Sequence, residues 1–291
     1  MKKLIRMSVV MCLVAGGVVL AAIPLLGQEK PAQGSKPAQG QQGQQSQAPQ
    51  GPQVSPQQVK DAQAVQNELD PEKQLQLVND FATKYPDSPY LSDMYFFGAY
   101  AAQQKGDIPK ILDYGEKSLK AKNDNMRTLL LMASILPRPQ VAQGAEADKR
   151  LSEAETDANK VLDMIPQLPK PPNQTDDQFQ QAKSAVTAEA HAALGMVHLQ
   201  RATQALSGPD AEELSKAEKE YQAAVSGPNP NPEDYFRLGE AYAMHNKTDE
   251  AINAFTKASQ LSQGGPLQTY AEQRLRAMKE KKAQAATPTK Q

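Results

Sequence analysis

A small set of alanine and aromatic residues recurs at a fixed distance in the second half of this 291-residue chain. Ala217, Tyr221 and Ala224 are followed 34 residues later by Ala251, Phe255 and Ala258. The pair Leu194-Gly195 returns as Leu238-Gly239 after 44 residues, which is the same period with ten residues added. Such a period predicts a row of similar units, because one unit of this length cannot bury its apolar face alone.

The units themselves are predicted to be helical. From Val59 onward, apolar residues recur at intervals of three and four, breaks fall at Pro, Gly and Asn-Asp clusters, and no stretch alternates as a strand does. Short turns between helices are typical of antiparallel hairpins. The expected helices are 59–69, 71–85, 89–105, 107–122, 124–136, 145–165, 176–206, 209–226, 231–246, 248–262 and 265–283. The predicted fold class is therefore all-α, an α-solenoid of antiparallel helix hairpins.

Residues 232–262 resemble the tetratricopeptide repeat, whose pattern is W-x₂-L-G-x₂-Y, then A-x₃-F, then P. Tyr235 stands in place of the Trp, and Gln263 in place of the Pro. The other matching positions are Leu238, Gly239, Tyr242, Ala251, Phe255 and Ala258. The resemblance implies that Gly239 and the two alanines let the paired helices approach closely, while the three aromatic residues fill gaps between units.

Three earlier stretches fit the same pattern more loosely. Residues 188–229 keep Leu194, Gly195, Ala217, Tyr221 and Ala224, with an insertion expected in the turn around Leu206–Pro209. Residues 126–166 keep the spacing with an extended turn. Residues 91–122 keep Gly98 and Tyr114 but fit one residue out of register, with Gly115 where an aromatic is expected. The sequence YPDSPY over residues 85–90 resembles a junction of tetratricopeptide-type proteins in the bacterial envelope.

The N-terminus predicts export. Lys2, Lys3 and Arg6 precede twenty uncharged residues, 7–26, which is the order of a secretory signal. An apolar run of that length also suits an uncleaved membrane anchor, and the sequence leaves both interpretations open. Residues 1–27 are therefore expected to be a signal peptide or an anchor, and the rest of the chain is expected to lie in the periplasm or cell envelope.

Residues 28–58 form the expected linker. They contain twelve Gln, five Pro and four Gly, with Val54 as the single large aliphatic residue. Such a segment buries too little apolar surface to offset the entropy lost on ordering, so it is predicted to be disordered. The remaining domains are a helical repeat domain over 59–283 and a disordered tail over 284–291.

The sequence offers little chemistry. Its 32 basic and 33 acidic residues nearly balance, which gives no electrostatic reason to expect a nucleic-acid partner. The single cysteine, Cys12, lies in the leading segment. His191 and His198 are seven residues apart, whereas helical metal pairs prefer three or four, so we interpret them as packed and hydrogen-bonded. No catalytic, metal or cofactor-binding residue is predicted, and the protein is not expected to be an enzyme.

A partner-binding groove is predicted where the first helices of successive units line one surface. The candidate residues are those beside the core positions: Tyr95, Phe96, Tyr100, Leu130, Met196, Leu199, Phe236, Arg237 and Glu240. Family members that clamp a C-terminal carboxylate use Lys and Asn here, so that activity is not implied. An apolar groove suits an extended or helical peptide. The alternative is that these residues pack the solenoid or cover the inserted turns.

The expected function is an exported, non-catalytic scaffold that mediates protein–protein interaction in the bacterial envelope. A structural subunit of an envelope assembly, without a transient peptide ligand, is the alternative. An enzyme of unrecognised type is the weakest of the three hypotheses.

Overall fold

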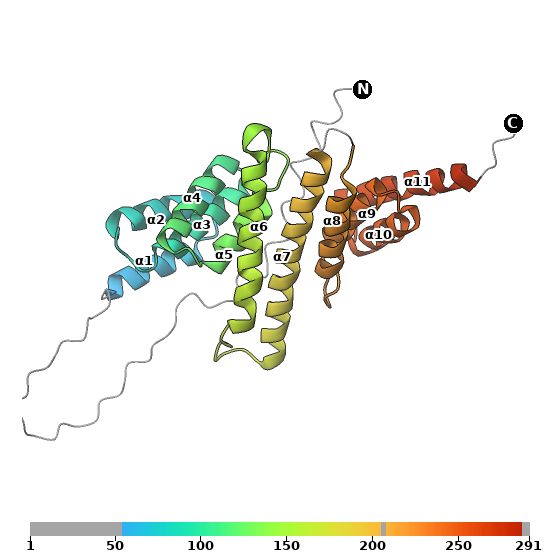
Figure 1. Cartoon of the computed structure of the whole chain (residues 1–291). Helices are drawn as coiled ribbons and strands as arrows, with labels where there is room; N and C mark the ends of the chain where they lie inside the picture. Colours follow the sequence, from blue (N-terminus) through green and yellow to red (C-terminus); the bar gives the residue numbers. More distant parts are fainter. Residues whose placement is uncertain (1–53, 205–207, 287–291) are drawn as a thin grey trace, which may run out of the picture.

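The computed structural model describes residues 54–204 and 208–286, and their regular structure is entirely helical (Figure 1). The expected signal segment, nearly all of the expected linker and the last five residues lie outside these ranges. The α-helices are α1 Pro56–Asn67, α2 Pro71–Lys84, α3 Leu91–Gln104, α4 Ile108–Ala121, α5 Met126–Ile135, α6 Ala147–Met164, α7 Asp176–Gln204, α8 Ala211–Ala224, α9 Pro232–Met244, α10 Thr248–Leu261 and α11 Pro266–Ala286. Two 3₁₀ turns flank α6, at Gly144–Glu146 and Ile165–Gln167.

The starts of the helices are fixed by local side-chain chemistry. The Asp70 carboxylate accepts hydrogen bonds from the Glu72 and Lys73 amides, and Pro71 occupies the first turn. Asp210 caps α8 in the same way, and Asn231 caps α9 ahead of Pro232. These caps satisfy amides that have no partner inside the helix, and proline supplies the helical φ without needing a donor.

Two expected domain boundaries differ from the structure. Helix α1 begins at Pro56, inside the segment assigned to the linker, because Ser55 caps it through the Gln58 amide. Helix α11 continues through Ala286, three residues into the segment assigned to the tail.

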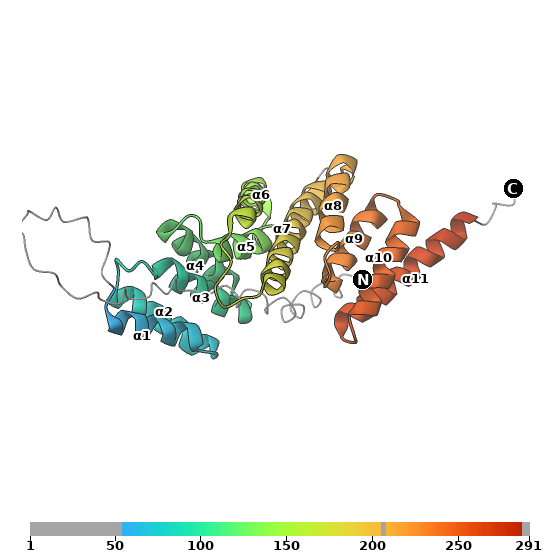
Figure 2. The ribbon, with the colours of Figure 1, turned by 90° about the horizontal axis from the view of Figure 1, so that it is seen from below.

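Each helix packs against the next, so the chain folds as a row of antiparallel hairpins. Figure 2 shows the row running from α1 and α2 at one end to α11 at the other. The odd-numbered helices also meet each other, with α5 contacting α7 and α7 contacting α9. No two even-numbered helices pack to this extent within the described residues. The fold is therefore an α-solenoid, as predicted, in which the odd-numbered helices α5, α7, α9 and α11 form a row, each in contact with the next.

The ten residues added between Gly195 and Tyr221 are not confined to a turn, although the sequence predicted an insertion there. Helix α7 runs nine residues past Gly195, whereas α9 runs five past Gly239. Helix α8 begins ten residues before Tyr221, whereas α10 begins seven before Phe255. Most of the insertion thus lengthens two helices by about one turn each, which satisfies its backbone groups internally.

The core follows the row as a chain of apolar clusters. One joins α1 to α5 around Met94 and Ile135, the next joins α5 to α7 around Leu129 and Val197, and another joins α7 to α10 around Tyr221. No helix within the described residues is long and apolar enough to cross a bilayer.

Candidate protein-binding face

Three of the hairpins, α3–α4, α7–α8 and α9–α10, are built on a repeated contact between a glycine and an aromatic ring. A Cβ added to Gly98 would lie 2.8 Å from the Tyr114 ring, one added to Gly195 2.9 Å from Tyr221, and one added to Gly239 2.7 Å from Phe255. Real Cβ atoms essentially never approach other atoms so closely. Each glycine on a first helix therefore makes room for an aromatic ring of the second helix.

This contact corrects two sequence predictions. Tyr114 follows Gly98 by 16 residues, as Phe255 follows Gly239. The aromatic residue of the 91–122 unit is therefore Tyr114, in register with the 232–262 unit, and the aromatic position does not fall on Gly115. Phe255 fills space within its own hairpin, where its ring also meets Phe236 at 5.5 Å between centroids. The expected small packing residues are buried: Ala217, Ala224, Ala251 and Ala258, together with Leu194 and Leu238.

The predicted apolar groove is wrong at three of its residues. Phe96, Leu130 and Leu199 are each at most 4% exposed and belong to the core clusters. Helix α5 is buried at nine of its ten residues, partly because Val141 and Ala142 of the following turn pack back on the clusters it joins. Tyr95 is half-buried, and its ring lies 6.4 Å from that of Tyr114. Half-buried Tyr100 stacks on Phe96, with 6.2 Å between centroids.

The remaining candidates form a strip on α7 and α9. Glu189 and Met196 of α7 are seven residues apart and share one side of the helix. They correspond, 44 residues later, to Glu233 and Glu240 of α9. We call this strip the α7–α9 face. It comprises the partly exposed residues Glu189, Met196, Glu233, Phe236, Arg237 and Glu240.

More of this face is made of charged side chains in ion pairs than the sequence predicted. Arg237 pairs with Glu240 at 3.0 Å and Glu233 at 3.5 Å, and Arg274 of α11 reaches Glu240 at 3.4 Å. Burial alone would lower the pKa of Arg237, but Glu240, Tyr221 and Glu233 hold it above its usual value. The predicted residues Arg237 and Glu240 are thus brought together, as partners of each other.

Two carboxyl groups, Glu189 on this face and Asp234 beside it, lack such a partner. Asp234, 8% exposed at the start of α9, forms no ion pair in the part of the chain that the structure describes, and neither does Glu189. Burial raises the pKa of Glu189 to about 7. Burial, and then the charges of Glu233 and Glu189, raises the pKa of Asp234 to about 7. Sequence reasoning missed both residues, although the correspondence of Glu189 with Glu233 was visible.

All three histidines hydrogen-bond to glutamates of helix α8. His191 Nδ1 lies 2.7 Å from Glu220, His198 Nδ1 2.8 Å from Glu213, and His245 Nδ1 2.8 Å from Glu218. The packed and hydrogen-bonded interpretation of His191 and His198 is confirmed. Within residues 54–204 and 208–286, no three His, Cys, Asp or Glu side chains gather closely enough to hold a metal ion.

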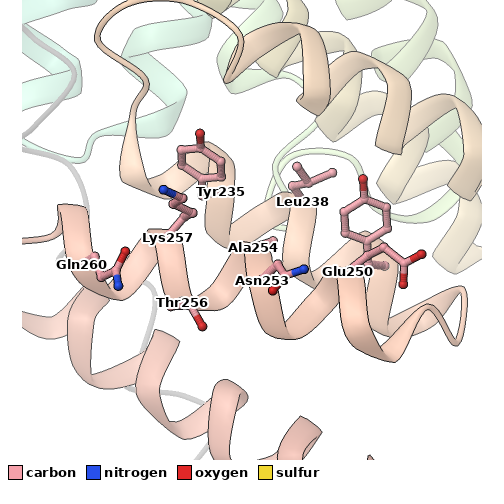
Figure 3. Close-up of a pocket in the computed structure, with 9 residues that line it drawn as sticks. Tyr235, Leu238, Glu250, Asn253, Ala254, Thr256, Lys257 and Gln260 are labelled. Atoms are coloured by element: carbon pink, nitrogen blue, oxygen red, sulfur yellow. The ribbon is translucent and has the colours of Figure 1, made fainter.

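A separate open groove of about 530 Å³ lies between α9 and α10. Its lining is mixed, with Tyr235 and Leu238 from α9 and Lys257 and Gln260 from α10 among the residues that border it (Figure 3). Tyr242 also lines it, and its hydroxyl accepts a hydrogen bond from Gln222 at 2.6 Å. Tyr235 and Tyr242 are therefore half-buried residues that border an open groove, rather than enclosed between units as predicted.

Comparison with known proteins supports the fold class. No protein-family model matches the chain, and no curated protein sequence matches it. Among solved structures, the chain is similar to "Assembly Chaperone of RpL4 (Acl4) (Residues 1-338)", with a TM-score of 0.53 and 16% sequence identity. The similarity covers 78% of this chain and 85% of that one. At this identity the likeness shows a shared fold.

Proposed function

We propose that the protein is an exported, non-catalytic scaffold that binds a segment of a partner protein along the α7–α9 face. The observation that carries this proposal is the strip itself. Met196 and Phe236 remain partly exposed among charged groups, in the row where the odd-numbered helices meet. A strip of apolar anchors flanked by charges suits an extended or helical peptide. The hairpins are, on this proposal, diverged tetratricopeptide repeats, supported by the recurring glycine–aromatic contact.

Export is the second part of the proposal. It is supported by the order of residues 1–27, where three basic residues precede an uncharged apolar run. The protein would act in the periplasm or cell envelope, free after cleavage or held by residues 7–26. The Gln-rich segment after it would then separate the membrane or cleavage site from the solenoid.

Site-specific photo-cross-linking tests the binding face. A photoreactive residue is placed at Met196 in the full chain, and a control is placed at Lys219, an exposed position on α8. We expect a protein cross-linked from position 196 and absent from position 219. Direct binding of that identified protein should then weaken at least tenfold in Met196→Arg, with the melting temperature retained. Equal cross-linking from both positions, or full affinity in Met196→Arg, would remove the α7–α9 face from the proposal.

A further inference from the structure

The groove between α9 and α10 lies on the opposite side of α9 from the α7–α9 face. Tyr235, Leu238 and Tyr242 border the groove and are spaced by three and four residues, so they share one side of the helix. Glu240 of the α7–α9 face is two residues from both Leu238 and Tyr242, which turns it just over half a helical turn away from each. A ligand in the groove would therefore leave the α7–α9 face free.

The groove opens where a contact of the preceding hairpin is missing. In the hairpin α7–α8, His191 Nδ1 lies 2.7 Å from the Glu220 carboxylate and bridges the two helices. Tyr235 follows His191 by 44 residues and Ala254 follows Glu220 by 34, so they are the corresponding pair in the next hairpin. Because alanine has no carboxylate to meet the tyrosine, a groove remains beside the ring, with Ala254 in its lining.

Glu250 and Lys257 give the groove one anionic and one cationic end. Figure 3 shows Lys257 beside Tyr235 at one end and Glu250 toward the other. Both side chains are exposed, and neither forms an ion pair in the part of the chain that the structure describes. Lys247, the cation nearest to Glu250 along α10, pairs with Glu218 of α8 instead. Both ends of the groove therefore have a charge that is available to a ligand.

The middle of the groove is apolar. Leu238 and Ala254, each 5% exposed, form its floor, and the half-buried rings of Tyr235 and Tyr242 are seven residues apart along it. An apolar strip between two opposite charges fits an amphipathic segment that has apolar residues between an acidic and a basic residue.

The spacing of the two charges favours a helical segment. Glu250 and Lys257 are seven positions apart on α10, which is about 10 Å along the helix axis. Residues seven positions apart on a bound helix share one side and have the same spacing. Residues on one side of an extended segment are about 7 or 13 Å apart, which matches less well.

We propose that this groove binds a helix of a partner protein that has an acidic and a basic residue seven positions apart, with apolar residues between them on the same side. The acidic residue lies at Lys257 and the basic residue at Glu250, while the apolar residues pack on Leu238 and Ala254. Apolar contact supplies the affinity, and the two charges set the register of the helix. The site goes beyond the proposed function, because it lets the scaffold hold a second segment on the other side of α9.

Synthetic helical peptides test the groove. The probe is acetyl-AQAAEQALLQAKAAQA-amide, in which Glu and Lys are seven positions apart with two leucines between them. A two-lysine form replaces its Glu by Lys, a glutamine form replaces both leucines by Gln, and circular dichroism checks that the three are equally helical. Fluorescence anisotropy measures binding to the full chain at low ionic strength. We expect the probe to bind, the two-lysine form to bind roughly fivefold more weakly, and the glutamine form not to bind.

Three variants assign the binding to the groove. Lys257→Glu should reverse the preference, so that the two-lysine form binds more tightly than the probe. Lys120→Glu makes the same change at an exposed position on α4 and should alter neither affinity. Ala254→Glu restores the carboxylate that α8 has at Glu220 and should weaken binding of the probe about tenfold, because it fills the apolar floor with a charge. A melting curve of each variant checks that it folds.

The groove and the proposed function fail separately. Absence of binding by the probe, an unchanged preference in Lys257→Glu or an unchanged affinity in Ala254→Glu would overturn the groove proposal. Met196→Arg should leave the affinity of the probe unchanged, since Met196 lies on the α7–α9 face. Weaker binding of the probe in that variant would move the probe to the α7–α9 face and likewise overturn the groove proposal.

Discussion

Replacing Gly239 by alanine tests whether the hairpins depend on the glycine–aromatic contact. In a helix interior this change normally stabilises by up to about 1 kcal/mol, because alanine has the higher helix propensity. Here the added methyl would lie 2.7 Å from two carbons of the Phe255 ring, well inside the ~3.5–4.0 Å at which carbon atoms attract. Overpacking of this kind costs about 1–3 kcal/mol. The net expectation is a destabilisation on the order of 1 kcal/mol.

Urea unfolding followed by circular dichroism measures this change in the full chain. The matched control is Gly227→Ala, because a Cβ there meets nothing within 4 Å and the backbone is not left-handed. That variant should be neutral, or more stable by about 0.4–1 kcal/mol through the unfolded state.

A double variant isolates the ring. With Phe255→Leu the aromatic carbons are gone, so Gly239→Ala should turn from destabilising to neutral or stabilising. The coupling between the two changes should be on the order of 1–3 kcal/mol. Additive effects, or a Gly239→Ala variant as stable as Gly227→Ala, would refute the idea that the ring is held against the glycine.

The remaining predictions concern pH, the buried polar contacts and location. Asp234→Asn should stabilise the protein at pH 8 and change little at pH 4. The pKa of Asp234 is raised from 3.8 to about 7, so its contribution to stability is complete at acid pH and is lost as the pH rises through 7. That loss is at most roughly 4 kcal/mol, and thermal melts at both pH values measure it. Ser118→Ala should cost about 1–3 kcal/mol in urea unfolding, since the fully buried Ser118 hydroxyl joins α4 to the Ser92 carbonyl and the Thr128 hydroxyl, both at 2.7 Å. Ser215→Ala on an exposed helix surface is its control and should be near neutral. Fractionation should recover the protein outside the cytoplasm. N-terminal sequencing should find a start near Gln28 for a cleaved signal or Met1 for an anchor, while cytosolic recovery would contradict export.

The helices could be predicted because their ends are set by local residues. Asp70-Pro71 and Asn231-Pro232 each combine a capping side chain with a proline in the first turn, and both begin helices where expected. The hairpin contacts were also accessible, since a glycine and an aromatic 16 residues apart recur in two units. The register of Tyr114 was harder to recognise, because Phe97 stands where the other two units have a leucine before the glycine.

The groove was harder to predict because periodicity does not say which side of an apolar helix is covered. Helix α5 is apolar on nearly every side. Its sequence therefore does not distinguish a surface position for Leu130 from a core position. The deciding factor is what packs against α5 from later in the chain: Leu130 shares its cluster with Ile165 and with Val186 and Ala190 of α7. The periodicity of α5 does not say where these distant residues will lie, so the burial of Leu130 emerges only in three dimensions.

The charge on the α7–α9 face was hidden for a different reason. Glu233 and Asp234 occupy the first turn of α9, where acidic residues are common because they complement the helix dipole. In the sequence both therefore look like exposed helix-starting residues. The structure separates them: Glu233 pairs with Arg237 on the surface, whereas Asp234 is buried toward α7, within reach of the charge of Glu189. One short acidic pair thus both starts a helix and places a buried carboxyl group, Asp234, beside the α7–α9 face.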